Sequence, residues 1–209
     1  MTKIKICGIT NTADALAAIE CGADMLGFVF TDQSPRQISL TSAIEIIKAC
    51  PPAIVKVGLF VNQEEELVKD IVKKSQLDYL QFHGQEPPDY CRRVSKSGKI
   101  IKAFRVKDHD SLKILPDYDV EIYLLDSYRE DKLGGTGHTF DWDLAISAKD
   151  YGRPIMLAGG LNPENVGQAV SRVRPYAVDV SSGIEKCPGK KDIKLMKEFI
   201  KEVRSYETA

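Results

Sequence analysis

The sequence predicts an α/β fold of one domain, a (β/α)8 or TIM barrel of eight parallel strands that spans residues 1–209. Short apolar runs rich in Ile, Val, Leu and Phe recur eight times, as buried parallel strands do. Segments with helical signals separate the runs, which is typical of βαβ units. The 209 residues leave about 26 for each unit, near the lower size limit of this barrel, whereas an open doubly wound sheet usually has fewer strands.

The apolar runs give the predicted strands. They are Lys3–Cys7, Asp24–Phe30, Ile54–Val61, Asp78–Phe82, Lys99–Val106, Glu121–Asp126, Pro154–Ala158 and Ala177–Ser181. Because strand side chains alternate, Lys5 and Cys7 share one face, and Ile4 and Ile6 share the other. We expect the isoleucines to contact the surrounding helices and Cys7 to face the mouth of the barrel.

Helices are predicted between these strands. They are Thr12–Cys21, Thr41–Cys50, Gln63–Gln76, Pro87–Ser97, Asp108–Leu115, Asp141–Tyr151, Pro163–Val173 and Asp192–Ser205. Asn11 can cap the first helix and Gly22 can end it. Pro163 follows Asn162, which places proline at the preferred first position after a cap.

Composition excludes several classes of protein. Lys and Arg number 29 against 30 Asp and Glu, so the basic excess of a nucleic-acid binder is absent. The chain shows neither an apolar run of ~20 residues nor a signal-peptide core, and we therefore expect a cytoplasmic protein without a membrane segment. The five cysteines are scattered, and no histidine spacing suits a metal. We expect no disulfide framework and no metal, and a monomer, with a homodimer as the alternative.

Two glycine-bearing loops follow the last two predicted strands. Gly159-Gly160 ends the seventh strand, and Ser182-Gly183 follows the eighth. Active sites of such barrels lie at the carboxyl ends of the strands, and the loops after strands seven and eight commonly bind phosphate through backbone N–H groups. The alternative is that these glycines only make tight turns.

Cys7 and Asp126 end the first and sixth predicted strands. Their side chains could meet a small substrate from opposite sides of the mouth. A thiolate base and a carboxylic acid placed in this way suit an isomerisation, which needs one proton removed and another delivered. Nearby positive charge would favour the thiolate. The alternatives are a buried core thiol and a helix-capping carboxylate.

Further residues near the mouth permit two interpretations each. Arg36 follows Pro35 and could grip a carboxylate with two hydrogen bonds, or it could be a solvated surface side chain. His83 could bind a ligand or satisfy a backbone group. The glycine loop Gly134–Trp142, which includes Gly137, could close over a substrate.

Lys5 and Asp179 both point inward on neighbouring strands by alternation. We hypothesise an ion pair beneath the site that brings positive charge near Cys7. The alternative is that Lys5 extends its ammonium to the bottom of the barrel.

The motifs, taken in order, resemble those of one enzyme family. They are Lys5–Thr10, Ala23–Phe30 with Ser34-Pro35-Arg36, Val57–Asn62, Gln81–Gly84, Leu125–Ser127, Gly134–Trp142, Leu157–Asn162 and Asp179–Gly183. Over essentially the whole chain they resemble the phosphoribosylanthranilate isomerases of tryptophan biosynthesis. One small departure is Phe82, where leucine is more common.

The resemblance implies a cofactor-free Amadori rearrangement. The substrate would be N-(5-phospho-β-D-ribosyl)anthranilate, and the product 1-(2-carboxyphenylamino)-1-deoxy-D-ribulose 5-phosphate. By this likeness Asp126 is the general acid, Cys7 the general base and Arg36 the group that holds the anthranilate carboxylate. The phosphate would lie at Gly159, Gly160, Ser182 and Gly183, with Gln81, His83, Asp179 and Gly137 lining the site.

Other phosphosugar proteins remain as alternatives. The related isomerase of histidine biosynthesis uses two aspartates and binds two phosphates, and Cys7 at the first position disfavours it. A pentulose-phosphate epimerase needs a metal site. A barrel that only binds a phosphorylated ligand is disfavoured by the presence of both Cys7 and Asp126.

Overall fold

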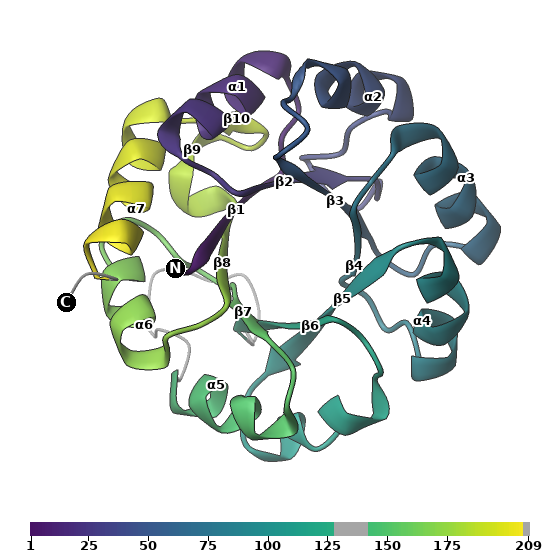
Figure 1. Ribbon diagram of the computed structural model, residues 1–209, viewed down its shortest axis with the longest axis vertical. Coiled ribbons are helices and arrows are strands. Elements are labelled where there is room, and N and C mark those ends of the chain that lie inside the picture. The colour runs from purple at the N-terminus through teal and green to yellow at the C-terminus, as the bar shows by residue number, and fades with distance from the viewer. Residues whose placement is uncertain (128–141, 207–209) are drawn as a thin grey trace.

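The computed structural model describes residues 1–127 and 142–206, and eight of the strands in these residues form a closed barrel. The strands are β1 (Lys3–Cys7), β2 (Met25–Val29), β3 (Val55–Phe60), β4 (Tyr79–Phe82), β5 (Lys99–Val106), β6 (Ile122–Ser127), β7 (Ile155–Leu157) and β8 (Ala177–Val180). Each strand pairs in parallel with the next, and β8 pairs with β1. Figure 1 shows this ring with the helices around its outside. The predicted barrel is therefore confirmed.

Seven α-helices lie around the barrel in the described part of the chain. They are α1 (Thr12–Cys21), α2 (Leu40–Ala49), α3 (Glu65–Ser75), α4 (Pro88–Val94), α5 (Trp142–Ala148), α6 (Val166–Val173) and α7 (Ile193–Ser205). As predicted, the Asn11 side chain caps α1 by accepting the Asp14 N–H, and Gly22 ends α1 in the left-handed conformation. The predicted start at Pro163 is wrong. The Asn162 side chain instead accepts the N–H groups of Glu164 and Asn165, which makes a turn, and α6 begins at Val166.

The predicted helix Asp108–Leu115 is also wrong. Two 3-10 turns, Asp110–Leu112 and Leu115–Asp117, stand in its place. Side chains here compete with helical carbonyl groups for the backbone N–H groups. Asp108 accepts the Ser111 N–H, and the Ser111 hydroxyl accepts the Lys107 N–H. Such local bonds favour turns over a continuing helix. Pro116, which has no N–H to donate, prevents a longer helix.

An antiparallel hairpin lies between β8 and α7, and the sequence does not predict it. A 3-10 turn (Ser182–Ile184) leads into β9 (Glu185–Cys187), which pairs with β10 (Lys190–Lys191). With three and two residues, these strands are too short to show an alternating pattern. The hairpin adds structure on the side of the barrel where β1 and β8 end.

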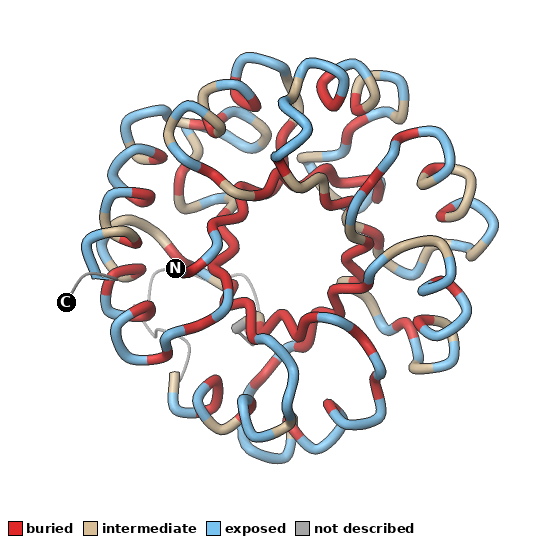
Figure 2. The backbone as a smooth tube through the Cα atoms, in the orientation of Figure 1, coloured by how far each residue is buried: buried red, intermediate tan, exposed pale blue. Residues whose placement is uncertain are grey.

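Two apolar cores form on the two faces of the sheet. Ile4 and Ile6 belong to the outer core, which packs against the helices, whereas Met25 and Val57 belong to the core inside the barrel. Figure 2 shows the strands as an almost continuous buried ring. Lys5 is also inside and is 0% exposed. The alternation predicted for β1 is therefore confirmed.

The hypothesised ion pair between strands β1 and β8 is confirmed. The Lys5 Nζ lies 2.9 Å from the Asp179 Oδ1, and the two residues are in register. The alternative, in which Lys5 reaches the bottom of the barrel, is wrong. A buried charge needs a partner, and Asp179 supplies one directly below the mouth.

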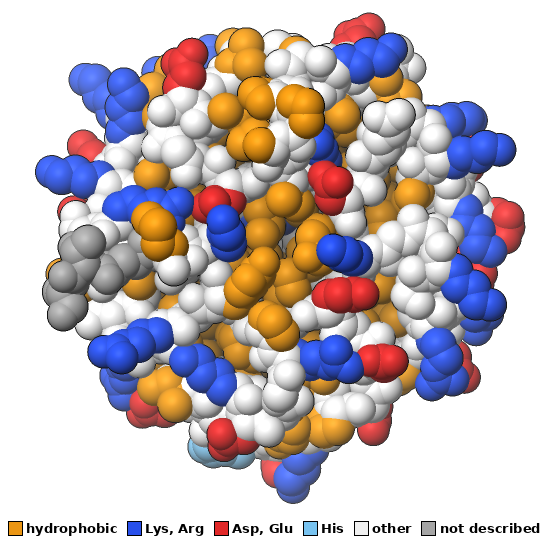
Figure 3. Space-filling view, in the orientation of Figure 1, with side chains coloured by type: hydrophobic (Ala, Val, Ile, Leu, Met, Phe, Trp, Pro, Cys, Tyr) orange, Lys and Arg blue, Asp and Glu red, His pale blue; other side chains and the backbone are white. Residues whose placement is uncertain are grey.

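The face shown in Figure 3 carries interspersed positive and negative side chains around an apolar centre. An ion-pair cluster joins the start of the barrel to the C-terminal helix, because Asp24 pairs with Lys3 and with Arg204 of α7, each at 2.9 Å. Asp24 also accepts the Ile4 N–H. Among the helices of the described residues, none combines the length and the hydropathy that crossing a membrane requires.

Replacing Asp24 by asparagine is expected to lower the free energy of unfolding by about 1–2 kcal/mol at neutral pH, as loss of hydrogen bonds to a charged group does. Burial opposes ionisation of Asp24, but bonds from Lys3, the Ile4 N–H and Arg204 outweigh it and lower the pKa. The stabilisation is therefore full above the unfolded-state pKa of about 4 and disappears as pH falls through the lower folded-state pKa. Urea unfolding at several pH values should show the two proteins converging in acid.

The matched control for this prediction is Asp110→Asn. Asp110 forms an ion pair with Lys113, but its side chain is 81% exposed, so the change should alter stability by less than about 0.5 kcal/mol. If Asp24→Asn lowers the free energy of unfolding by the same amount at low pH as at neutral pH, the prediction is contradicted.

Candidate active site

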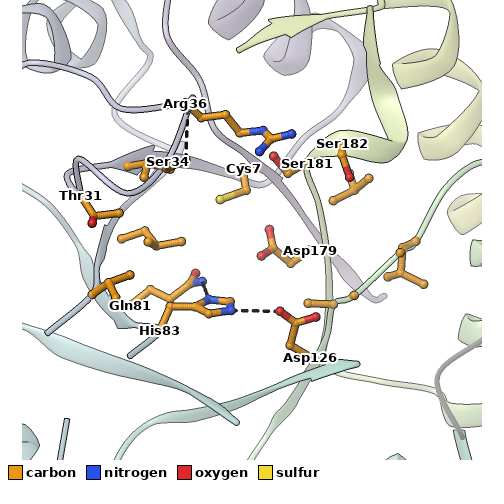
Figure 4. Close-up of a pocket in the computed structure, with 18 of the residues that line it drawn as sticks. Cys7, Thr31, Ser34, Arg36, Gln81, His83, Asp126, Asp179, Ser181 and Ser182 are labelled. Carbon is orange, nitrogen blue, oxygen red and sulfur yellow. Dashed lines mark hydrogen bonds and ion pairs between the residues drawn. The ribbon is translucent and has the colours of Figure 1, made fainter. Parts of the chain in front are cut away.

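A cavity of about 580 Å³ opens where the barrel strands end. This volume is within the usual range of small-molecule sites. Most of the candidate residues line it: Cys7, Arg36, Gln81, His83, Asp126, Gly159, Gly160, Asp179 and Ser182. Figure 4 shows the labelled side chains converging from β1, β4, β6 and β8 and from the loops after β2 and β8. Gly183 is beside the cavity without lining it, and Gly137 lies outside the described residues.

Cys7 lies at the end of β1 and is 5% exposed. Burial raises the pKa of its thiol, and Asp179 adds to this effect, whereas Lys5 and Lys191 lower the pKa without cancelling the rise. Two lysines thus supply the positive charge that a thiolate needs in an apolar setting. The thiol is mostly protonated until the pH approaches this raised pKa.

Gly27 on β2 makes room for Cys7 and Lys5. A β-carbon at Gly27 would lie 2.9 Å from the Cys7 Sγ and 3.1 Å from the Lys5 Nζ. Real β-carbons essentially never approach other heavy atoms more closely than 3.0 Å. The sulfur and the ammonium therefore share the space that a side chain on the neighbouring strand would fill.

Asp126 at the end of β6 is held by a chain of side chains from β4. The His83 Nε2 lies 3.0 Å from the Asp126 Oδ2, and the Gln81 Nε2 lies 3.1 Å from the His83 Nδ1. When the Gln81 amide donates to Nδ1, the His83 proton must be on Nε2, which then donates to the carboxylate. His83 therefore fixes the orientation of Asp126 toward the cavity, as Figure 4 shows.

Two buried polar atoms beside the cavity have no partner in the described part of the chain. They are the Oε1 of Gln81 and the hydroxyl of Ser181, and both residues line the cavity. Buried polar groups are rarely left without a hydrogen bond. These atoms are thus available to a polar ligand.

The loops after β7 and β8 approach each other closely. A β-carbon on Gly183 would collide with the carbonyl oxygen of Leu161, so only glycine permits this contact. Gly159 and Gly160 adopt φ values of 80° and 73°. Their N–H groups form no hydrogen bond within the described residues, and the loops therefore offer free backbone donors at the cavity wall.

Arg36 is bound to Glu185 of the β9–β10 hairpin. The Arg36 Nε lies 2.9 Å from one carboxylate oxygen of Glu185, and the Nη2 lies 2.6 Å from the other. Lys191 also contacts Glu185 at 2.9 Å. The interpretation of Arg36 as a solvated surface residue is wrong, since its side chain is only 21% exposed.

Sequence reasoning misses Glu185 and Lys191. Their only signal is the Pro188-Gly189 pair between charged residues after the eighth strand, which indicates a turn but not its contacts. Within the described residues, no group of three or more His, Cys, Asp or Glu side chains could hold a metal ion.

Comparison with known proteins identifies the family. The model of the family N-(5'-phosphoribosyl)anthranilate (PRA) isomerase matches residues 4–202. The N-(5'-phosphoribosyl)anthranilate isomerase of Geobacter sulfurreducens is 50% identical over 99% of this chain and 100% of its own length. That of Geotalea uraniireducens is 53% identical over 98% of this chain and 99% of its own length.

Solved structures agree with these relatives. Phosphoribosyl anthranilate isomerase from Thermotoga maritima superposes with a TM-score of 0.92 at 45% identity, covering 98% of this chain and 100% of that one. A structure of the enzyme in complex with reduced 1-(o-carboxyphenylamino)-1-deoxyribulose 5-phosphate has a TM-score of 0.89 at 42% identity, with the same coverage. The Thermotoga maritima enzyme is also described as dimeric. With a matching family model and relatives of this similarity over nearly its full length, this chain belongs to the N-(5'-phosphoribosyl)anthranilate isomerase family and is an isomerase.

Proposed function

We propose that this isomerase converts N-(5-phospho-β-D-ribosyl)anthranilate to 1-(2-carboxyphenylamino)-1-deoxy-D-ribulose 5-phosphate in tryptophan biosynthesis, with Asp126 as general acid and Cys7 as general base. The observation that carries the proposal is the position of these two groups. They end β1 and β6, three strands apart around the barrel, and both line one cavity. A sugar bound between them would have an acid on one side and a base on the other.

The first step of the proposed reaction opens the ribose ring. Asp126 gives its proton to the furanose oxygen while the C1–O bond breaks, and the anthranilate nitrogen supplies the electron pair that forms the C1=N bond. His83 contacts one carboxylate oxygen but not the other, Oδ1, from which the proton would be transferred. A correctly placed acid or base accelerates such a step by about 10²–10⁴-fold.

In the second step, the Cys7 thiolate removes the proton from C2. The electrons of the C2–H bond form a C1–C2 double bond as the C1=N electrons return to nitrogen, and the resulting enolamine becomes the ketone by proton transfer. Lys5 and Lys191 lower the pKa of Cys7 against the effect of burial, which supports its use as a base. Every step uses acid–base chemistry alone, so the proposal needs no cofactor.

Three features support the binding of this substrate. Gly159 and Gly160 offer N–H groups that bond to none of the described residues and can receive the 5-phosphate, and Ser182 and Gly183 lie in the neighbouring loop. Arg36, which also lines the cavity, supplies positive charge for the anthranilate carboxylate. The partnerless atoms of Gln81 and Ser181 can hydrogen-bond the sugar hydroxyls or the amine between these two ends.

A turnover assay tests the proposed function directly. The purified protein is incubated with N-(5-phosphoribosyl)anthranilate, whose fluorescence falls as the product forms. The aminoaldose substrate of the histidine-pathway isomerase serves as the competing substrate in a parallel reaction. We expect rapid loss of fluorescence with the first compound. Preference for the second compound, or no turnover of the first, would refute the assignment.

A further inference from the structure

Glu185 occupies one complete edge of the Arg36 guanidinium. Its two oxygens accept from Nε and Nη2 in the side-on bidentate arrangement, which fixes the plane of the group as well as its position. The Glu185 side chain is 4% exposed. Although burial opposes ionisation, hydrogen bonds from Arg36 and Lys191 keep the pKa of Glu185 below its usual value. The carboxylate therefore stays charged at working pH, and Arg36 stays bound.

Lys191 anchors Glu185 to the strands that carry the catalytic candidates. Its Nζ donates to the Glu185 Oε1 at 2.9 Å, the Cys7 carbonyl at 2.6 Å and the Ser181 carbonyl at 3.3 Å. These three bonds satisfy all three ammonium donors. The side chain is 0% exposed. The hairpin, the end of β1 and the end of β8 are thus joined at one buried charge.

Gly8 allows Arg36 to lie against the end of β1. A β-carbon at Gly8 would lie 2.7 Å from the Arg36 Cδ and 3.1 Å from the Ser181 hydroxyl oxygen, so the arginine stem occupies the space beside the residue that follows Cys7. Figure 4 shows the guanidinium extending from the β2 loop toward Ser181. A group held by Arg36 would therefore be close to the proposed base.

The end-on edge of the Arg36 guanidinium forms no hydrogen bond with the part of the chain that the structure describes. Of its five N–H donors, Glu185 takes one on Nε and one on Nη2. No acceptor among the described residues bonds to Nη1. The end-on edge, formed by Nη1 and the second Nη2 hydrogen, can thus donate hydrogen bonds to another carboxylate while Glu185 remains in place. Arg36, Lys191 and Glu185 together carry one net positive charge, which attracts that carboxylate.

We infer that Glu185 is a positioning residue for substrate recognition, which holds the Arg36 guanidinium so that its end-on edge receives the carboxylate of the substrate's aromatic ring. The inference rests on the proposed function, because that function supplies the aromatic carboxylate. It assigns the β9–β10 hairpin to substrate specificity. Removing the charge of Glu185 should free the guanidinium to rotate and weaken recognition of that one group.

The test compares two substrates that differ only in the ring carboxylate. They are N-(5-phosphoribosyl)anthranilate and N-(5-phosphoribosyl)aniline, and chromatography measures the conversion of each one. For the first, we expect Glu185→Gln to raise KM about tenfold, as loss of a charge-assisted contact does, with a much smaller effect on kcat. For the aniline compound, kcat/KM should change less than about twofold. The matched control is Glu65→Gln, which breaks the ion pairs with Lys69 and Arg93 on the outside of the barrel.

A double-mutant cycle tests whether Glu185 acts through Arg36. Arg36→Met alone should weaken binding of the anthranilate substrate, and adding Glu185→Gln to it should have no further effect. Equal losses for both substrates would show a merely structural role and overturn the inference, as would full additivity of the two changes. If the wild-type protein fails to turn over the anthranilate substrate, the proposed function falls and the inference falls with it.

Discussion

Replacing Cys7 by alanine is expected to lower kcat for N-(5-phosphoribosyl)anthranilate by about 10³-fold, within the range for loss of a general base, with only a small change in KM. The thiol is small and buried, so alanine fits the same space without new contacts. The lost group would act only when the C2 proton leaves, and an interaction made only in the transition state affects kcat rather than binding. Continuous or discontinuous fluorescence assays measure kcat and KM.

Cys91→Ala is the matched control for this prediction. Cys91 is 1% exposed and lies in the outer core away from the cavity. Removing its sulfur should reduce stability slightly and leave kcat and KM unchanged. A Cys7→Ala protein that retains more than about a third of the wild-type kcat would remove the thiol from the mechanism.

The pH dependence of the wild-type enzyme gives a second measurement on the same group. Because burial raises the pKa of Cys7, the thiolate fraction is small at neutral pH and increases as pH rises toward that pKa. The acid side of the kcat profile should therefore lie at alkaline pH. In Cys7→Ala, the residual kcat should no longer increase with pH in this range. A profile unaltered by the substitution would show that another group titrates.

Side-chain alternation is what made the barrel interior predictable. In β1, Ile4 and Ile6 contact the helices, and Lys5 and Cys7 face inward, because a strand in a closed sheet can present only two faces. Register between neighbouring strands then brought Lys5 opposite Asp179. Contacts between adjacent barrel strands follow from the order of the strands, and sequence patterns reveal that order.

The contacts made by loops were not predictable in the same way. Glu185 and Arg36 are 149 positions apart and meet only because the short β9–β10 hairpin folds back over the end of β1. Likewise, the Asp108–Leu115 segment has helix-compatible composition, and side-chain bonds of Asp108 and Ser111 decide its structure. Such tertiary and side-chain contacts do not change the local periodicity of apolar residues, so that periodicity cannot predict them.

Replacing Asp126 by asparagine is expected to lower kcat by about 10³-fold or more, because an amide cannot give up a proton to the furanose oxygen. Asparagine keeps the size of the side chain and an oxygen that can accept from His83 Nε2, so the cavity and its hydrogen bonds should persist. KM should change little. The substitution thus separates the acidic proton of Asp126 from its structural contact.

Asp119→Asn is the corresponding control, because Asp119 pairs with Arg153 and is 85% exposed outside the cavity. A His83→Phe variant distinguishes positioning from proton donation: it removes the contact at 3.0 Å but leaves the carboxyl group. We expect its kcat to fall less than that of Asp126→Asn, since a disordered acid still donates. If instead Asp126→Asn is nearly fully active and His83→Phe is inactive, the proton that opens the ring comes from the imidazole, and the acid in the proposed mechanism must be reassigned.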